Sequence, residues 1–193
     1  MNDENFSPKE SLLLIQSMID KTKQSISDKS MYYLVWGWIT FVACTGQFIL
    51  KHIYDYPRHY YVWWLIVPGV VFSIVYSSRE SKKQKVRTYV GESVKFLWIG
   101  MGFAYFVLSM ILSEIGWDKP IYPFFIMLYG LGTFVSGSII KFRPLILGGL
   151  CAFILAIVST YASYDFQMLY GSAAMLVSYI IPAYILRARQ RHV

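Results

Sequence analysis

Six long apolar stretches with almost no charge occupy most of this 193-residue chain. They cover residues 31–53, 60–76, 94–112, 121–140, 145–162 and 166–186. A helix needs about 20 apolar residues to cross the ~30 Å hydrocarbon core of a bilayer, which is the length scale of these stretches. Only 15% of the residues are charged, against roughly 25% in a soluble domain. The sequence therefore predicts an all-α integral membrane protein, a bundle of six transmembrane helices in one domain over residues 31–193.

Residues 1–30 precede the first stretch and predict a cytoplasmic amphipathic helix followed by a linker. Ser7 and Glu10 have the spacing of a capping box, and Pro8 falls at the first helical position, where its missing N–H costs nothing. Apolar residues then recur at helical spacing, which favours a helix over residues 8–27. This helix is expected to lie on the membrane surface or on the cytoplasmic end of the bundle. The alternative is that it docks a membrane or cytoplasmic protein partner.

The lysines and arginines are distributed unequally between the two sides of the predicted membrane domain. Of the 18 in the chain, only Lys51, Arg58 and Lys119 fall on the side opposite the termini, which leaves fifteen on the other side. Short cytoplasmic loops carry such an excess, so both termini are expected in the cytoplasm. The densest run is assigned to topology and to anionic lipid head groups; it contains Arg79, Lys82, Lys83, Lys85 and Arg87. The sequence shows no nucleic-acid-binding module, and no nucleic-acid partner is predicted.

Aromatic residues and small residues recur between the first two predicted helical hairpins. Trp36 corresponds to Trp98 at an offset of 62, while Gly69 and Ser73 correspond to Gly132 and Ser136 at an offset of 63. Repeated hairpins would produce this pattern, and so would the limited residue alphabet of membrane helices. Trp36, Trp98 and Tyr33 are expected at the cytoplasmic interface, where rings with one polar edge settle.

Small residues four apart predict where helices approach each other closely. The fifth stretch carries Gly148, Ala152 and Ala156 along one face, and the fourth carries Gly132 and Ser136. Small side chains let helix backbones meet, and dispersion then drives packing in lipid. Packing within the bundle is the main expectation, and homodimerisation through the fifth helix is the alternative.

Few residues in this chain carry chemistry. No ionisable residue lies near the middle of a predicted span, although such a group usually marks an ion or proton pathway. No catalytic or phosphate-binding motif is present, so neither an enzyme nor a cofactor is predicted. The candidate metal ligands are His52, Asp55 and His59, which flank the first outer loop. Pro57 prevents one helix from presenting all three, and the alternative is that they are solvated loop residues.

Two functions follow from these observations. The first is a non-enzymatic scaffold, sensor or accessory subunit, favoured by the lack of charge within the spans and by the basic, amphipathic cytoplasmic side. The alternative is a small transporter or channel for a neutral or apolar solute, since Gly and Pro interrupt the second, fourth and sixth spans. Transport requires a cavity lined by Thr40, Gln47, Ser73 or Ser136. An enzyme acting from the outer loops ranks below both.

Three short stretches resemble a group of small uncharacterised bacterial inner-membrane proteins. They are Leu34–Trp38 (LVWGW), Tyr129–Thr133 (YGLGT) and Ser178–Pro182 (SYIIP). The resemblance extends over nearly the whole chain and includes the capped amino-terminal helix. It implies a multi-pass protein of the bacterial cytoplasmic (inner) membrane. The group brings no known activity, so no residue role follows from it.

Overall fold

The computed structural model describes residue 12 and residues 30–83, 89–116 and 120–191. Over these residues the chain is helical and contains no strand, which confirms the all-helical prediction for the described part. The first long helix spans Ser30–Ile53 and ends in the π-helical turn η1 (Ile49–Ile53). The others are η2 (His59–Leu65), α2 (Ile66–Lys83), α3 (Tyr89–Ile115), α4 (Tyr122–Ile140), α5 (Arg143–Ser159), α6 (Tyr164–Met175), η3 (Leu176–Ile180) and α7 (Ile181–Arg191).

Five of these helical segments are long and apolar enough to cross a membrane. They are Ser30–Ile53, His59–Arg79, Tyr89–Ile115, Tyr122–Ile140 and Tyr164–Ala188, and the apolar helix Arg143–Ser159 is shorter. This fifth helix was expected over residues 145–162 but ends at Ser159. The hydroxyls of Ser159 and Thr160 bond to carbonyls three residues back, and the chain then turns. The predicted helix over residues 8–27 lies outside the described residues, apart from Leu12.

Two of the three departures from regular α-helix lie next to a proline. The 3₁₀ segment η2 lies just before Pro68, and the π-helical turn η3 lies just before Pro182. Proline has no N–H, so the carbonyl four residues earlier loses its partner and the winding adjusts locally. The fourth span was expected to be interrupted in the same way. Instead Pro123 sits in the first turn of α4, which continues as regular helix to Ile140.

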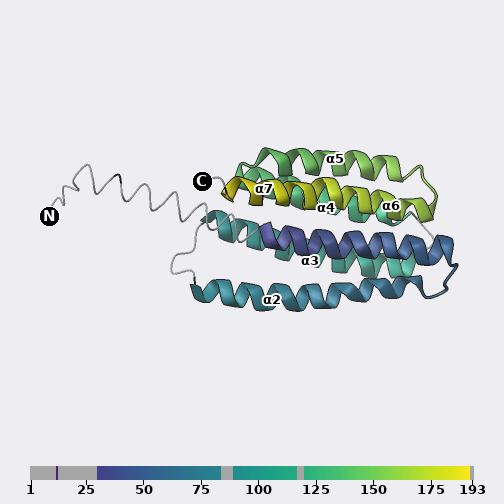
Figure 1. Ribbon diagram of the computed structural model, residues 1–193. Helices are drawn as coiled ribbons and strands as arrows, with labels where there is room; N and C mark the ends of the chain where they lie inside the picture. Colours follow the sequence, from purple (N-terminus) through teal and green to yellow (C-terminus); the bar gives the residue numbers. More distant parts are fainter. Residues whose placement is uncertain (1–11, 13–29, 84–88, 117–119, 192–193) are drawn as a thin grey trace.

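The helices form one elongated bundle, with α5 along one edge and α2 along the other in the view of Figure 1. The closest pair is α4 and α5, which are joined by a tight turn with Lys141 in the left-handed conformation (φ 57°). By contrast, only 6% of the apolar window of His59–Arg79 and 11% of that of Tyr89–Ile115 are buried, against 56% for Tyr164–Ala188. The second and third spans therefore present most of their apolar surface to the surroundings.

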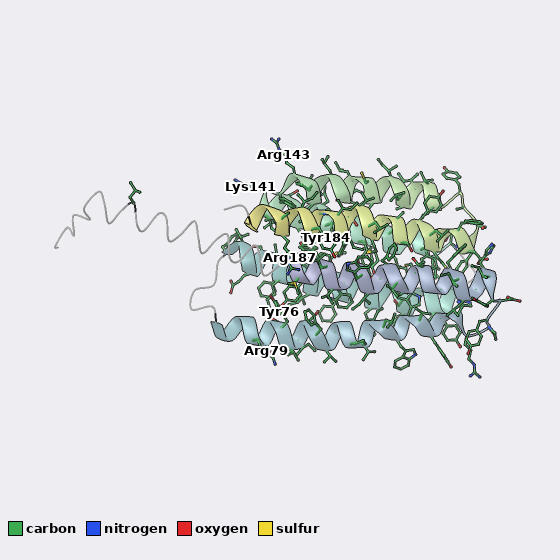
Figure 2. The ribbon with its side chains drawn as sticks, viewed as in Figure 1. Tyr76, Arg79, Lys141, Arg143, Tyr184 and Arg187 are labelled. Carbon is green, nitrogen blue, oxygen red and sulfur yellow. The ribbon has the colours of Figure 1, made fainter. Side chains whose placement is uncertain are left out.

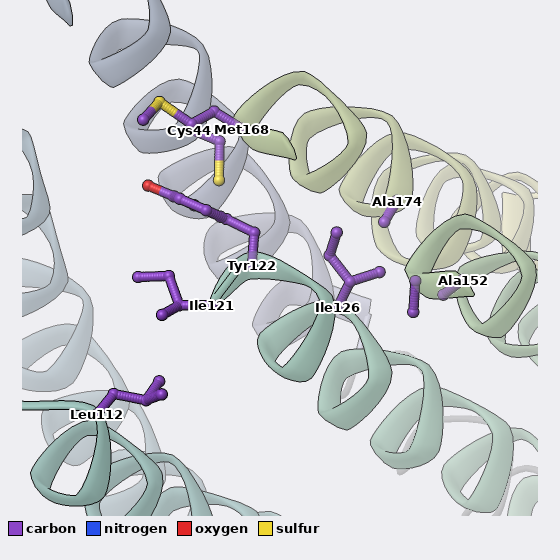
Figure 3. Packing of buried hydrophobic residues seen from close by; sticks show 9 residues of the cluster. Cys44, Leu112, Ile121, Tyr122, Ile126, Ala152, Met168 and Ala174 are labelled. Carbon is purple, nitrogen blue, oxygen red and sulfur yellow. The ribbon is translucent and has the colours of Figure 1, made fainter. Parts of the chain in front are cut away.

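The core consists of two clusters, one toward each end of the bundle. One cluster surrounds Tyr122 and Ile126 of α4 and includes Cys44 of the first helix and Met168 of α6. Figure 3 shows the Tyr122 ring lying beside Cys44 and Met168. The other cluster contains Tyr33, Leu145 and Tyr179. The first helix, α4, α5 and α6 meet in these clusters and hold the residues considered next.

Candidate functional site

The most connected polar residue in the described structure is Gln47, which is buried in the first helix with 3% of its surface exposed. Its amide oxygen accepts hydrogen bonds from Trp63 Nε1 of η2 and from the Tyr122 hydroxyl of α4. Its amide nitrogen lies 3.0 Å from His59 Nδ1. An indole N–H can only donate, so the atom facing Trp63 must be the oxygen. The amide NH₂ therefore donates to His59, and this bond requires a neutral imidazole with its proton on Nε2.

An ionic group lies beside this amide at the same end of the bundle. Asp165, in the first turn of α6, accepts from Lys51 Nζ at 3.0 Å and pairs with His52 Nδ1 at 3.1 Å. The π-helical turn Ile49–Ile53 carries both bases to the side of α6. Lys51 Nζ also lies 3.9 Å from the centre of the Tyr164 ring. A carboxylate in the first turn of a helix is favoured by the helix dipole, which adds to the pairing.

These residues are referred to together as the Gln47 cluster: Gln47, Lys51, His52, His59, Trp63, Tyr122, Tyr164 and Asp165. They come from the first helix, η2, α4 and α6. Each exposed ion pair contributes only about 0–1 kcal/mol. The buried amide contributes more, because removing it strands polar groups in an apolar setting. The cluster therefore stabilises the contact of four helical segments at this end of the bundle. The imidazoles of His52 and His59 are both bonded to neighbouring side chains.

The three candidate metal ligands are not brought together. His52 faces Asp165, His59 faces Gln47, and Asp55 is exposed in the loop with φ 45°. In the described part of the chain, no group of three His, Cys, Asp or Glu side chains is arranged to hold a metal ion. The contact between His52 and Asp165 joins the first helix to the start of α6.

Toward the opposite end lies a packed group of aromatic rings. Tyr33, Trp98 and Tyr179 contact each other edge to face with centroids 5.7–6.0 Å apart, and Tyr129 joins them at 5.9 Å from Tyr179. Among the described residues, the buried hydroxyls of Tyr33, Tyr105 and Tyr179 have no hydrogen-bond partner. Such groups are rare in protein interiors and are costly there. Tyr33 was expected at the interface; it is buried because its side of the helix faces α3 and η3.

The predicted packing residues lie at helix contacts inside the bundle. A Cβ on Gly132 would lie 3.0 Å from the Trp98 ring, and one on Gly148 would lie 2.7 Å from the Val177 carbonyl oxygen. Ala152 and Ala156 are buried in the core around Tyr122, and the buried Ser136 donates to the Gly132 carbonyl. The face of the fifth helix proposed for homodimerisation is thus covered by the chain itself.

The closest helix contact, between α4 and α5, was not predicted from the sequence. A Cβ on Gly149 would lie 2.7 Å from the Phe134 nitrogen and 2.8 Å from the Gly130 oxygen. A Cβ on Gly137 would lie 2.7 Å from the Ile146 nitrogen. Gly130 and Gly137 are seven residues apart and therefore share one helix face. That spacing was the available sequence signal.

The described basic residues near the predicted cytoplasmic loops gather at one end of the bundle. Figure 2 places Arg79, Lys141, Arg143 and Arg187 at the end away from the Gln47 cluster. Of the predicted lipid-contacting run, Arg79 is exposed, while Lys82 and Lys83 are in the last turn of α2. Lys85 and Arg87 lie outside the described residues.

Comparisons with protein-family models, with curated proteins and with solved structures found no match to this chain. The kinship with small bacterial inner-membrane proteins stays a prediction from the sequence.

Proposed function

We propose that the chain is a multi-pass membrane protein that acts as a non-enzymatic scaffold, sensor or accessory subunit. The membrane location is supported by the exposed apolar surface of α2 and α3, where Ile74 is 62% and Phe103 is 68% exposed. A surface of this kind is unfavourable in water and suits hydrocarbon. The charge bias and the resemblance favour a bacterial inner membrane with both termini in the cytoplasm.

The observation that carries the proposal is the state of the polar residues that a solute pathway would need. Thr40 and Ser136 are buried, with 2% and 0% of their surfaces exposed. Ser136 bonds to its own helix, Ser73 accepts from Trp36 Nε1 and donates to the Gly69 carbonyl, and Gln47 is fully engaged. Side chains that are packed and paired in this way do not line a water-filled cavity. This arrangement favours a structural or accessory role over transport.

The test is isolation of the tagged protein from its native membranes in mild detergent, followed by quantitative mass spectrometry of the recovered proteins. A partner at a fixed stoichiometry is expected. A variant with Leu12→Ser, Ile15→Ser and Ile19→Ser should lose this partner if the apolar face of residues 8–27 makes the contact. The matched control is Gln16→Ser with Gln24→Ser, which changes other positions of the same segment. Recovery of the unaltered chain alone, at one defined size, would overturn the proposal and favour a self-contained transporter.

A further inference from the structure

We propose that η2 is held by a pH-sensitive contact, and that a proton taken up by His59 releases η2 from the first helix. The inference rests on the proposed function in its sensor form. It names the signal as the proton concentration on the side of the membrane opposite the termini. The change is local, because it concerns the attachment of one short helical segment and leaves the contact between α4 and α5 in place.

The attachment of η2 to the first helix depends on two side-chain hydrogen bonds. None of the seven residues of this 3₁₀-helix is buried, and it begins without a side-chain cap. Hydrogen bonds within a 3₁₀-helix also have poorer geometry than those of an α-helix. The side chains of His59 and Trp63 both bond to the amide of Gln47 in the first helix. This amide therefore joins both ends of η2 to the first helix.

The amide of Gln47 cannot satisfy Trp63 and a protonated His59 at the same time. An indole N–H and a protonated imidazole can only donate, so each of them needs the amide oxygen. In the present orientation the oxygen accepts from Trp63, and the NH₂ donates to His59 Nδ1 at 3.0 Å. Protonation places two donors face to face at His59, and turning the amide round transfers the conflict to Trp63. In either orientation η2 loses one of its two hydrogen bonds.

His59 is open to protons from the end of the bundle, and the charges beside it are paired. It is half-buried and follows the exposed loop. Of the described charged groups, Lys51 of the first helix and Asp165 of α6 interact with it, and these two pair with each other at 3.0 Å. The Tyr60 ring lies edge to face with the imidazole at 5.9 Å, and Tyr122 of α4 donates to the shared amide. Phenols do not ionise between about pH 5 and 8, which is the range in which histidine changes its charge.

Hydrogen–deuterium exchange of the full chain in phosphatidylcholine nanodiscs, read by mass spectrometry at pH 7.5 and 5.5, tests the proposal. Each observed rate is divided into the intrinsic exchange rate at that pH, which gives a protection factor. Protection of residues 59–65 is expected to fall about three- to ten-fold at pH 5.5, the equilibrium equivalent of one hydrogen bond. Protection of residues 145–158 in α5 should stay the same, and it shows whether each variant is folded.

Two histidine variants distinguish this contact from a general effect of acid. His59→Asn supplies an amide oxygen that can accept from Gln47 at either pH. Protection of η2 should therefore no longer depend on pH in this variant. His52→Asn is the matched control, because it removes the other histidine at this end, which faces Asp165, and it should keep the acid response.

Trp63→Phe tests the competition for the amide oxygen. It should lower the protection of η2 at both pH values and reduce the acid response, because the amide is then free to turn its oxygen to protonated His59. The proposal is overturned by an unaltered protein that shows no acid response in η2, or by a response of undiminished size in His59→Asn or Trp63→Phe. The isolation of a partner tests the proposed function separately, since exchange in nanodiscs requires no partner.

Discussion

The indole nitrogen of Trp36 donates to Ser73 Oγ at 3.0 Å, and the ring lies over Gly69, one turn away on the same helix. The contact between ring and glycine recurs in the next hairpin, where the Trp98 ring lies over Gly132. In both hairpins the serine donates to the carbonyl of that glycine, Ser73 to Gly69 and Ser136 to Gly132. The residues spaced 62 and 63 apart in the sequence therefore make equivalent helix contacts. This supports the hypothesis that the first two hairpins are repeats.

The glycine contacts predict a position-dependent cost of adding one methyl group. Gly149→Ala should destabilise the bundle by about 1–3 kcal/mol, the usual cost of overpacking a filled contact. The added Cβ meets backbone atoms of α4, which cannot move aside. Gly100→Ala is the control, because it has the same intrinsic helix preference and open space around it. Thermal unfolding in detergent measures the difference, and equal midpoints for the two variants would refute the close α4–α5 contact.

Removing the buried amide should be among the most destabilising single changes. Gln47→Leu leaves three groups without their partner, namely Trp63 Nε1, the Tyr122 hydroxyl and His59 Nδ1. Each buried group left without a partner lowers the free energy of unfolding by about 1–3 kcal/mol. Combining it with Tyr122→Phe should cost less than the sum of the two single changes. A double-mutant cycle measured by unfolding gives the coupling, expected at about 0.5–3 kcal/mol for residues of one network. Strict additivity would show that the two side chains do not interact.

Acid should weaken the bundle through His59. Its Nδ1 must accept from Gln47, and protonation converts that acceptor to a donor. A free histidine takes up a proton at about pH 6.5, and in the bundle this proton would cost the bond to Gln47. The contribution of this bond to the free energy of unfolding is therefore fully present above about pH 6.5 and declines as the pH falls below that value.

The matched comparison for this pH effect is His59→Asn against His52→Asn. Unfolding midpoints measured between pH 7.5 and 5 should lose most of the acid-dependent decline in His59→Asn. His52→Asn leaves the bond between Gln47 and His59 in place and should keep the decline. The reverse pattern would mean that His59 is not held in its neutral form.

The unpartnered phenols predict an unusual gain from losing a hydroxyl. Tyr179→Phe should leave stability unchanged or raise it by up to about 1 kcal/mol, since it removes a buried polar group that makes no hydrogen bond. Tyr122→Phe deletes the same atom from a tyrosine that donates to Gln47, and should destabilise. If both variants lose stability to the same extent in chemical unfolding, Tyr179 has a partner in solution.

The helices could be predicted from the sequence because apolar length and charge distribution are properties of contiguous segments. Most of their ends agree within three residues, but α2 continues to Lys83, α3 begins at Tyr89 and α7 ends at Arg191, each five to seven residues beyond the predicted apolar stretch. Local irregularities lie at Pro68, Pro182 and the hydroxyls of Ser159 and Thr160. The Gln47 cluster could not be predicted in the same way. Gln47, Trp63 and Tyr122 lie far apart in the chain, and only the meeting of three helical segments brings them together.

The direction in which each side chain faces was the other feature that the sequence did not predict. Gln47 would line a cavity only under the transport alternative, and in the structure it bonds to neighbouring side chains. Tyr33 was expected among head groups, and it lies in the core. In a helix that is apolar nearly all round, the sequence pattern does not distinguish the face toward lipid from the face toward other helices.

Solvent access to the interior tests the central claim of a packed, non-transporting bundle most directly. Single cysteines at Thr40, Ser73 and Ser136, in a background with Cys44→Ala and Cys151→Ala, are treated in membranes with a water-soluble thiol reagent. A cysteine at Asp55, which is exposed in the loop, serves as the positive control. A packed bundle should show rapid labelling at position 55 and none at the three interior positions over the same time. Labelling at position 40 or 136 at a rate approaching that of position 55 would contradict it and reveal a water-filled path through the bundle.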